Sequence, residues 1–160
     1  NASMGSLYRS KHELILIGKH GKASHINNVQ LGKYKRYRTN VWRYAGANSF
    51  GPERKELKNH PTPKPVALVA DAIRDVSNRD QIVLDSFMGA GATLLAAERT
   101  GRIAYGIDIH PGYIDVCIAR WQKMTQQQAI LEATGQTHTE VQQERKITID
   151  KAHIDNESRP

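Results

Sequence analysis

The sequence predicts an α/β fold built on an open, mostly parallel sheet. Three observations predict it: a helical apolar periodicity near residues 66–76, two short apolar runs that each end in an aspartate, and a glycine-rich turn between those runs. Helix, strand, helix, strand and helix in this order are typical of open parallel sheets. The length of 160 residues suits one domain.

The helices are predicted from the spacing of apolar residues and from their ends. The first begins at Pro65: an N–H in the first turn of a helix has no partner within the helix, so proline, which has no N–H, is tolerated there. The polar run 77–80 ends this helix. The second covers about residues 92–99 and stops at Gly101. Apolar faces with helical spacing mark the first and third helices: Val66, Val69, Ala70, Ile73 and Val76, and Ile114, Cys117, Ile118 and Trp121.

Short apolar runs predict the strands. Residues 82–84 are followed by Asp85, and residues 103–107 are followed by Asp108; both runs suit a buried parallel sheet. The run 12–17, His-Glu-Leu-Ile-Leu-Ile, predicts a further buried strand.

The remaining segments are less regular. Residues 27–63 lack periodicity and predict a long loop or small subdomain. Residues 126–134 are expected to extend the third helix, and the polar stretch 137–160 is expected to be frayed or disordered.

Positive charge gathers at the front of the chain. Residues 1–60 hold 12 lysines and arginines against 3 acids, whereas residues 61–125 hold 7 of each and residues 126–160 hold 4 against 6. Because lysine and arginine release the counterions condensed on polyanions, this asymmetry indicates a polyanionic partner. The alternative is a solvated basic surface that only aids solubility.

Several classes are excluded or disfavoured. No run approaches the roughly 18 apolar residues of a membrane span, so we expect no membrane segment. The single Cys117 excludes an internal disulfide and lies on an apolar helix face, where it is expected in the core. With no secretory signal at the start, a cytoplasmic location is expected. The seven scattered histidines suggest no metal site.

The segment 85–93, Asp-Ser-Phe-Met-Gly-Ala-Gly-Ala-Thr, carries the strongest chemical signal. A phosphate-binding P-loop would need Gly-Lys-Ser/Thr, and a dinucleotide fingerprint would need glycine at Leu94, so the first is excluded and the second is partial. An acid beside the turn disfavours pyrophosphate and favours a cationic ligand such as S-adenosylmethionine. Asp108, 17 residues after Gly91, suits the two ribose hydroxyls of a nucleoside ligand. Each acid taken singly is also compatible with a helix cap.

Three stretches together resemble one family: 60–68 (His-Pro-Thr-Pro-Lys-Pro-Val-Ala-Leu), 85–93, and 105–108 (Tyr-Gly-Ile-Asp) with Tyr113. They are similar to the amino-group DNA methyltransferases that methylate adenine N6 or cytosine N4, in the permuted order of cell-cycle-type adenine methyltransferases. The resemblance covers about residues 6–125. It implies a Rossmann-like methyltransferase fold, of which this chain holds the C-terminal half with an incomplete sheet.

The resemblance also implies the cofactor residues. Thr62 and Lys64 would approach the carboxylate of S-adenosylmethionine, and His60 would shape that stretch. Asp108 would hold the ribose, and Thr93 would lie beside the methionine portion. The full implied set is His60, Thr62, Lys64, Asp85, Ser86, Phe87, Gly89, Gly91, Thr93 and Asp108. Ser86 stands where the family usually has proline, and Ala90 and Ala92 each replace a hydroxyl residue beside Gly91.

The family's catalytic Asp/Asn/Ser-Pro-Pro-aromatic motif does not occur, since the chain has no Pro-Pro dipeptide. We therefore expect a fragment that lacks its N-terminal catalytic half and is inactive alone. Residues 1–3 are interpreted as a tag remnant, 4–60 as a basic strand-plus-loop region, 61–125 as the cofactor-binding half, and 126–160 as a helical extension and polar tail. A truncated sheet exposes an edge and an apolar face, so self-association is expected.

The region 33–44 interleaves cations with aromatic residues, a pattern that neutralises phosphates and stacks on bases. The expected contacts to double-stranded DNA are Lys33, Lys35, Arg36, Arg38 and Arg43. The alternative is a basic loop that packs on its own domain through Trp42 and Tyr44. Two other functions remain open: a non-catalytic DNA-binding module with a degenerate methyltransferase fold, and a nicotinamide-dependent oxidoreductase.

Overall fold

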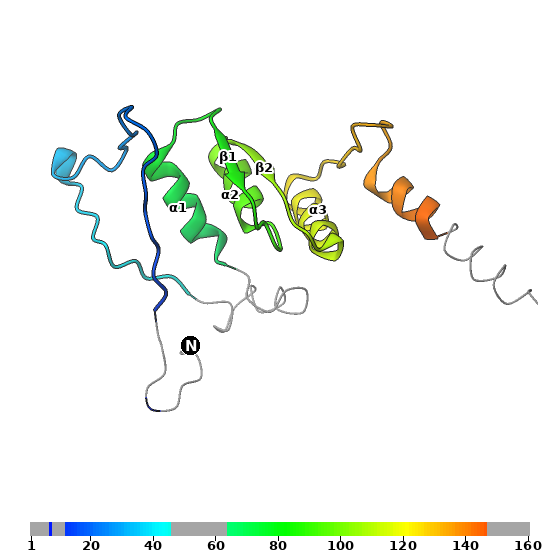
Figure 1. The fold of residues 1–160 in the computed structure, drawn as a ribbon, viewed down its shortest axis with the longest axis horizontal. Coiled ribbons are helices and arrows are strands. Elements are labelled where there is room, and N and C mark those ends of the chain that lie inside the picture. The colour runs from blue at the N-terminus through cyan, green and yellow to red at the C-terminus, as the bar shows by residue number, and fades with distance from the viewer. Residues whose placement is uncertain (1–6, 8–11, 46–63, 147–160) are drawn as a thin grey trace, which may run out of the picture. The chain divides into compact units, whose positions relative to one another are not determined.

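The computed structural model describes residues 7, 12–45 and 64–146 (Figure 1). The chain divides into two compact units, the first ending at Cys117 and the second starting at Ile118. The elements follow in the order η1 (Lys33–Lys35, a 3-10 helix), α1 (Val66–Val76), β1 (Ile82–Asp85), α2 (Ala92–Thr100), β2 (Ile103–Gly106) and α3 (Pro111–Thr125). This order confirms the predicted α/β class, and the boundaries of α1, β1 and α2 lie within one residue of those predicted.

The two strands are parallel neighbours. Ile82 pairs with Ile103, and the register runs to Asp85 opposite Gly106. One further backbone bond, from the N–H of Ile107 to the carbonyl of Asp85 at 2.9 Å, extends the contact beyond β2. Both strands therefore end at the same edge of the sheet, as carboxyl ends of parallel strands must. The following loops, which carry the predicted site, begin side by side.

Two helices build the core of the first unit. Helix α2 packs against both strands, and α1 packs against α2 (Figure 1). The buried apolar residues come mainly from these helices: Val66, Ala70, Ile73, Leu95, Ala96 and Ala97. Along each strand the exposure alternates, and the exposed residues are Ile82, Leu84, Ile103 and Tyr105. Apolar side chains thus remain exposed on the sheet face opposite to the one that carries the half-buried Val83 and Ala104.

The predicted strand at 12–17 is not formed. Leu14, Leu16 and Ile17 are each more than four-fifths exposed, and no strand pairs with them within the described part of the chain. A strand needs a hydrogen-bonded neighbour, because its backbone groups are otherwise satisfied only by water. The apolar composition of residues 12–17 is therefore not enough to form a strand. Residues 27–45 agree with the predicted loop and contain only η1.

The second unit differs from the expectation at both of its segments. The helix does not extend through 126–134; instead Ile130 and Thr137 form an isolated antiparallel bridge. Residues 138–146, expected to be frayed, are helical. Thr137 and Glu140 bond each other's backbone N–H groups, at 3.3 Å and 2.7 Å, and this reciprocal pair is a capping box that starts the helix.

Parts of the predicted site fall beyond this description. His60, Thr62 and the tail 147–160 lie outside the described residues. Among the residues that are described, no helix is long and apolar enough to cross a bilayer.

Candidate functional site

The turn after β1 is organised by Asp85. One carboxylate oxygen accepts a hydrogen bond from the backbone N–H of Phe87 at 3.0 Å, and the other accepts one from the hydroxyl of Thr93 at 2.6 Å. Asp85 therefore links the end of the strand to the first turn of α2. It does not cap α2, because the residue at that position is Gly91 and no side chain bonds there.

Asp108 holds the same turn from the neighbouring strand. Its Oδ2 accepts a hydrogen bond from the N–H of Gly89 at 2.8 Å, and its Oδ1 accepts one from the N–H of His110 at 2.9 Å. The backbone adds a further link, from the N–H of Met88 to the carbonyl of Ile107 at 3.0 Å. Carboxylate oxygens can accept more than one hydrogen bond each, so this arrangement orients Asp108 and is compatible with accepting hydroxyl groups of a ligand.

Close packing beneath the turn requires a glycine at position 91. Gly91 has φ +77°, a left-handed conformation, and a Cβ added there would lie 2.3 Å from Sγ of the buried Cys117. A Cβ on Gly106 would lie 1.6 Å from Cε of Met88. Met88 and Cys117 also contact each other, with their sulfur atoms 3.6 Å apart. The predicted core position of Cys117 is thus confirmed, and its side chain fills the space that Gly91 leaves.

Three other members of the predicted cofactor set are described by the structure: Ser86, Phe87 and Lys64. Phe87 is 90 % exposed and Ser86 is exposed, so both side chains face solvent next to Asp85. Lys64, just before α1, forms an ion pair with Glu13. The structure thus brings together Asp85, Gly89, Gly91, Thr93 and Asp108 as one bonded and packed cluster.

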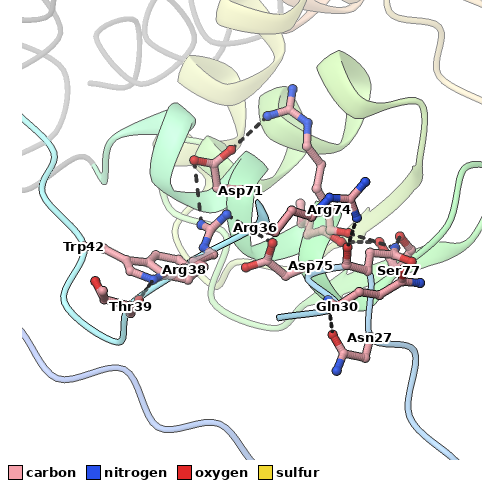
Figure 2. Close-up of polar contacts among 12 residues, drawn as sticks. Asn27, Gln30, Arg36, Arg38, Thr39, Trp42, Asp71, Arg74, Asp75 and Ser77 are labelled. Atoms are coloured by element: carbon pink, nitrogen blue, oxygen red, sulfur yellow. Dashed lines mark hydrogen bonds and ion pairs between the residues drawn. The ribbon is translucent and has the colours of Figure 1, made fainter. Parts of the chain in front are cut away.

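The basic segment, residues 33–44, contacts α1 through Arg38 and Tyr44. Arg38 forms ion pairs with Asp75 at 3.1 Å and Asp71 at 3.8 Å, and its guanidinium lies 4.2 Å from the centre of the Trp42 ring. Figure 2 shows the Arg38 side chain beside Trp42, with a contact to Asp71. Tyr44 donates a hydrogen bond to Asp71. A pocket of about 580 Å³ lies between this segment and α1, away from the glycine turn.

These contacts change how the nearby groups titrate. The hydrogen bond from Tyr44 lowers the pKa of Asp71, and burial together with that bond raises the pKa of Tyr44. Burial raises the pKa of Asp75, although Arg38 opposes the shift. Asp71 is therefore held as a carboxylate by its partners, whereas burial makes Asp75 easier to protonate than a free aspartate.

Sequence reasoning missed the residues that support these sites. Asp71 and Asp75, four residues apart and hence on one side of α1, are the partners of the basic segment. Asn28, which precedes that segment, donates side-chain hydrogen bonds to backbone carbonyls at the end of the same helix. The acid pair at helical spacing, in a chain whose front third is strongly basic, is a signal that could have identified the contact.

Comparison with known proteins gives the family. The model of the DNA methylase family, the N6/N4 methyltransferases, matches residues 2–120. The chain therefore belongs to this family. This confirms the family predicted from the three sequence stretches, its Rossmann-like methyltransferase fold in partial form, and S-adenosylmethionine as the family's cofactor.

Relatives are similar over part of their length. The chain is 33 % identical over 90 residues to the Type II methyltransferase M.ScaI of Streptomyces caespitosus, covering 55 % of this chain and 29 % of that protein. It is 31 % identical over 122 residues to the Type II methyltransferase M.HpaI of Haemophilus parainfluenzae, covering 71 % and 39 %. The chain thus spans less than half the length of these relatives.

Two solved structures of similar proteins match part of the chain. The M1.HpyAVI–SAM complex is 27 % identical, with 62 % of this chain and 45 % of that chain covered and a TM-score of 0.46. The PvuII cytosine-N4-specific DNA methyltransferase is also 27 % identical, with 52 % and 32 % covered and a TM-score of 0.46.

Proposed function

We propose that this chain is the cofactor-binding part of a site-specific DNA methyltransferase. The whole enzyme transfers a methyl group from S-adenosylmethionine to the exocyclic amino group of adenine or cytosine, within a cytoplasmic restriction-modification system. One observation carries the proposal: Asp85 and Asp108, at the ends of adjacent parallel strands, hold a single glycine turn through three hydrogen bonds. Family membership supports it.

The cluster suits the charges of the cofactor. S-adenosylmethionine carries an ammonium and a sulfonium group, and the carboxylate of Asp85 lies at the start of the turn, where it attracts a cation. Asp108 accepts the ribose hydroxyls, as acids at this strand end do in nucleotide sites. The exposed Phe87 and Ser86, next to Asp85, contact the bound cofactor, and Lys64, with His60 and Thr62, takes the cofactor carboxylate. Lys64 already binds a carboxylate, that of Glu13, which the cofactor would replace.

Double-stranded DNA is the proposed substrate. Lys33, Lys35, Arg36 and Arg43 are all exposed, as side chains that neutralise phosphates must be. Tyr34 lies between two of them, with Lys33 Nζ 5.3 Å and the Arg36 guanidinium 5.5 Å from its ring centre. Contacts of this kind keep the cations on one exposed surface.

The catalytic Pro-Pro motif is supplied by polypeptide outside this sequence, and the isolated chain is inactive. Ile82, Leu84, Ile103 and Tyr105 support this, because these exposed apolar residues form a face that another layer would cover. We assign that layer to the missing catalytic half. Without it, the isolated chain is expected to self-associate, and sedimentation that shows only monomer at high concentration would contradict this assignment.

Calorimetric titration with S-adenosylmethionine tests the function. The unaltered chain is expected to bind, and Asp108→Ala is expected to lose binding while remaining folded by circular dichroism. Binding of NADH instead would favour the oxidoreductase. If neither ligand binds, the same titration is repeated on a longer chain that includes the catalytic half; continued absence of binding there would support a degenerate, non-catalytic module.

A further inference from the structure

Residues 29–37, here called the basic loop, carry positive charge without any acid. The loop holds Lys33, Lys35 and Arg36. Its apolar and aromatic side chains are also open to solvent, with Leu31, Tyr34 and Tyr37 at 66 %, 76 % and 82 % exposure. The loop therefore presents cations and rings outward rather than packing them against its own unit.

The backbone of the basic loop is strained. Gln30, Tyr34 and Lys35 have φ of +47°, +54° and +58°, a region that residues with a side chain rarely adopt. The loop is closed by short-range bonds: the Gly32 N–H to the Arg36 carbonyl at 2.9 Å and the Arg36 N–H to the Lys33 carbonyl at 3.1 Å. Such conformations persist only where the surrounding structure fixes them. The two ends of the loop must therefore be held.

Asn28 holds the first end. Its backbone N–H bonds the carbonyl of Asp75 at 2.9 Å, and its side-chain amide bonds the carbonyls of Arg74 and Ser77 at 2.9 Å and 2.8 Å. The last carbonyls of a helix have no partner within the helix, so Asn28 satisfies the end of α1 from a distant part of the chain. Its own carbonyl accepts a bond from Arg36 at 3.2 Å, which ties the loop back to this point.

Arg38 holds the second end. Its guanidinium lies between Asp71, Asp75 and the Trp42 ring, and its side chain is only 31 % exposed. Both of these carboxylates pair with the Arg38 guanidinium, so its charge is already compensated within the chain and is not available to neutralise a phosphate. Arg38 therefore differs from the exposed cations Lys33, Lys35 and Arg36, although all four look alike in the sequence.

We propose that Asn28 and Arg38 are positioning residues that fix both ends of the basic loop on α1, so that Lys33, Lys35 and Arg36 contact DNA phosphates while Arg38 contacts none. This inference rests on the proposed function, because it assumes that DNA is the partner. It removes Arg38 from the predicted contacts and gives it a part that acts through the loop.

The salt dependence of DNA binding separates a contact from a positioning residue. Fluorescence anisotropy of a labelled mixed-sequence duplex is measured with the full chain across a range of NaCl concentrations. Each lost phosphate contact lowers the slope of log Kd against log salt by about 0.9. Lys35→Gln is expected to show this drop. Arg38→Gln removes the same charge, yet it is expected to weaken binding about fivefold or more with the slope unchanged; a slope drop equal to that of Lys35→Gln would overturn the proposal.

Asp75→Asn distinguishes two roles of Arg38, as a phosphate contact or as a positioning residue, because it changes DNA affinity in opposite directions in the two cases. If Asp75 merely competes with phosphate for Arg38, the variant binds DNA more tightly and with a steeper slope. If Asp75 holds Arg38 in place, as proposed, the variant binds more weakly. Tighter binding would therefore overturn the proposal.

Hydrogen exchange tests the positioning without DNA. The amides of Gly32 and Arg36 are expected to exchange faster in Arg38→Gln and in Asn28→Ala, and no faster in Lys35→Gln, while the α2 amides keep their protection in all three. Unchanged protection of the loop in the first two variants would overturn the proposal. If the unaltered chain binds S-adenosylmethionine but no DNA, the phosphate contacts fail while the cofactor site stands. If it binds neither, and the longer chain that includes the catalytic half also binds neither, the proposed function fails as well.

Discussion

The carboxylate of Asp108 accepts a hydrogen bond from the backbone N–H of Gly89 at 2.8 Å. The acid that ends the second strand region therefore fixes the turn that follows the first strand. In a parallel pair both of these segments begin at the same edge, so a single carboxylate can join them. Asp108, the residue predicted to bind the ribose, thus also stabilises the turn that would hold the methionine end of the cofactor.

Asp108→Asn is expected to lower the free energy of unfolding by about 1–3 kcal/mol. An amide keeps one acceptor oxygen, so one of the two N–H groups of Gly89 and His110 would face an NH₂ group instead. Urea unfolding followed by circular dichroism measures the change. Asp80→Asn is the matched control, because Asp80 is exposed with φ +64°, which asparagine tolerates. Equal stability of both variants would contradict the role of Asp108.

Thr93→Val is expected to weaken S-adenosylmethionine binding about tenfold, since it removes a hydrogen bond to a charged group. Valine keeps the shape of threonine but lacks the hydroxyl that donates to Asp85 at 2.6 Å. The carboxylate would then lose one of the two bonds that orient it. Calorimetric titration measures the affinity, and Thr93→Ser, which retains the donor, is expected to bind nearly as the unaltered chain does. Wild-type affinity in the valine variant would show that this bond does not orient the site.

Gly91→Ala is expected to destabilise the first unit strongly. The added methyl group meets Cys117 Sγ, and φ of +77° disfavours any side chain. The conformational cost alone is about 1–2 kcal/mol, and overpacking adds about 1–3 kcal/mol. Chemical denaturation measures the total.

A matched glycine isolates the two effects. Gly21 has φ +78° but no atom within 4 Å of an added Cβ, so Gly21→Ala should show the conformational cost without the clash. Combining Gly91→Ala with Cys117→Ala should recover most of the packing part only, because alanine removes the Sγ at 2.3 Å and keeps the Cβ at 3.1 Å. If the two single glycine variants are equally stable, close packing on Cys117 is not what requires Gly91.

The central βαβ unit could be predicted because its signals are local. Apolar runs that end in Asp85 and Asp108, and the glycine turn before α2, determine their elements through short-range geometry. The run 12–17 carries an equally strong apolar signal but forms no strand, since pairing depends on a neighbour that composition does not reveal. The helix at 138–146 had a local signal, Thr137 and Glu140 at capping-box spacing, which its polar composition obscured.

The contacts of the basic segment could not be predicted one by one. Arg36 and Arg38 are two residues apart in a uniformly basic stretch, yet Arg36 is exposed and Arg38 lies between two aspartates. Asp71 and Asp75 are more than thirty residues further along the chain, and only the fold brings them to Arg38. Arg38 and Tyr44 therefore pack on their own domain, as the alternative interpretation of this segment expects of a basic loop, whereas Lys33 and Lys35 remain exposed.

Tyr44→Phe is expected to lower the free energy of unfolding by about 1 kcal/mol near neutral pH, because Asp71 loses a hydrogen-bond donor. The lowered pKa of Asp71 means that its contribution is present above the ordinary value of 3.8 and is lost as pH falls through the folded value. The raised pKa of Tyr44 means that its contribution is present below 10.0 and is lost as pH rises through the folded value. The bond therefore stabilises the chain between these limits.

The difference in stability between the unaltered chain and Tyr44→Phe should accordingly be largest from about pH 5 to 9 and shrink on both sides. Asp75, whose raised pKa adds stability as pH falls, is present in both proteins, so most of its effect cancels in the difference. Tyr37→Phe, at an exposed tyrosine, should show no such pH dependence. A difference between the unaltered chain and Tyr44→Phe that stays constant from pH 3 to 10 would show that Tyr44 contributes by packing, since packing does not titrate, and not through its bond to Asp71.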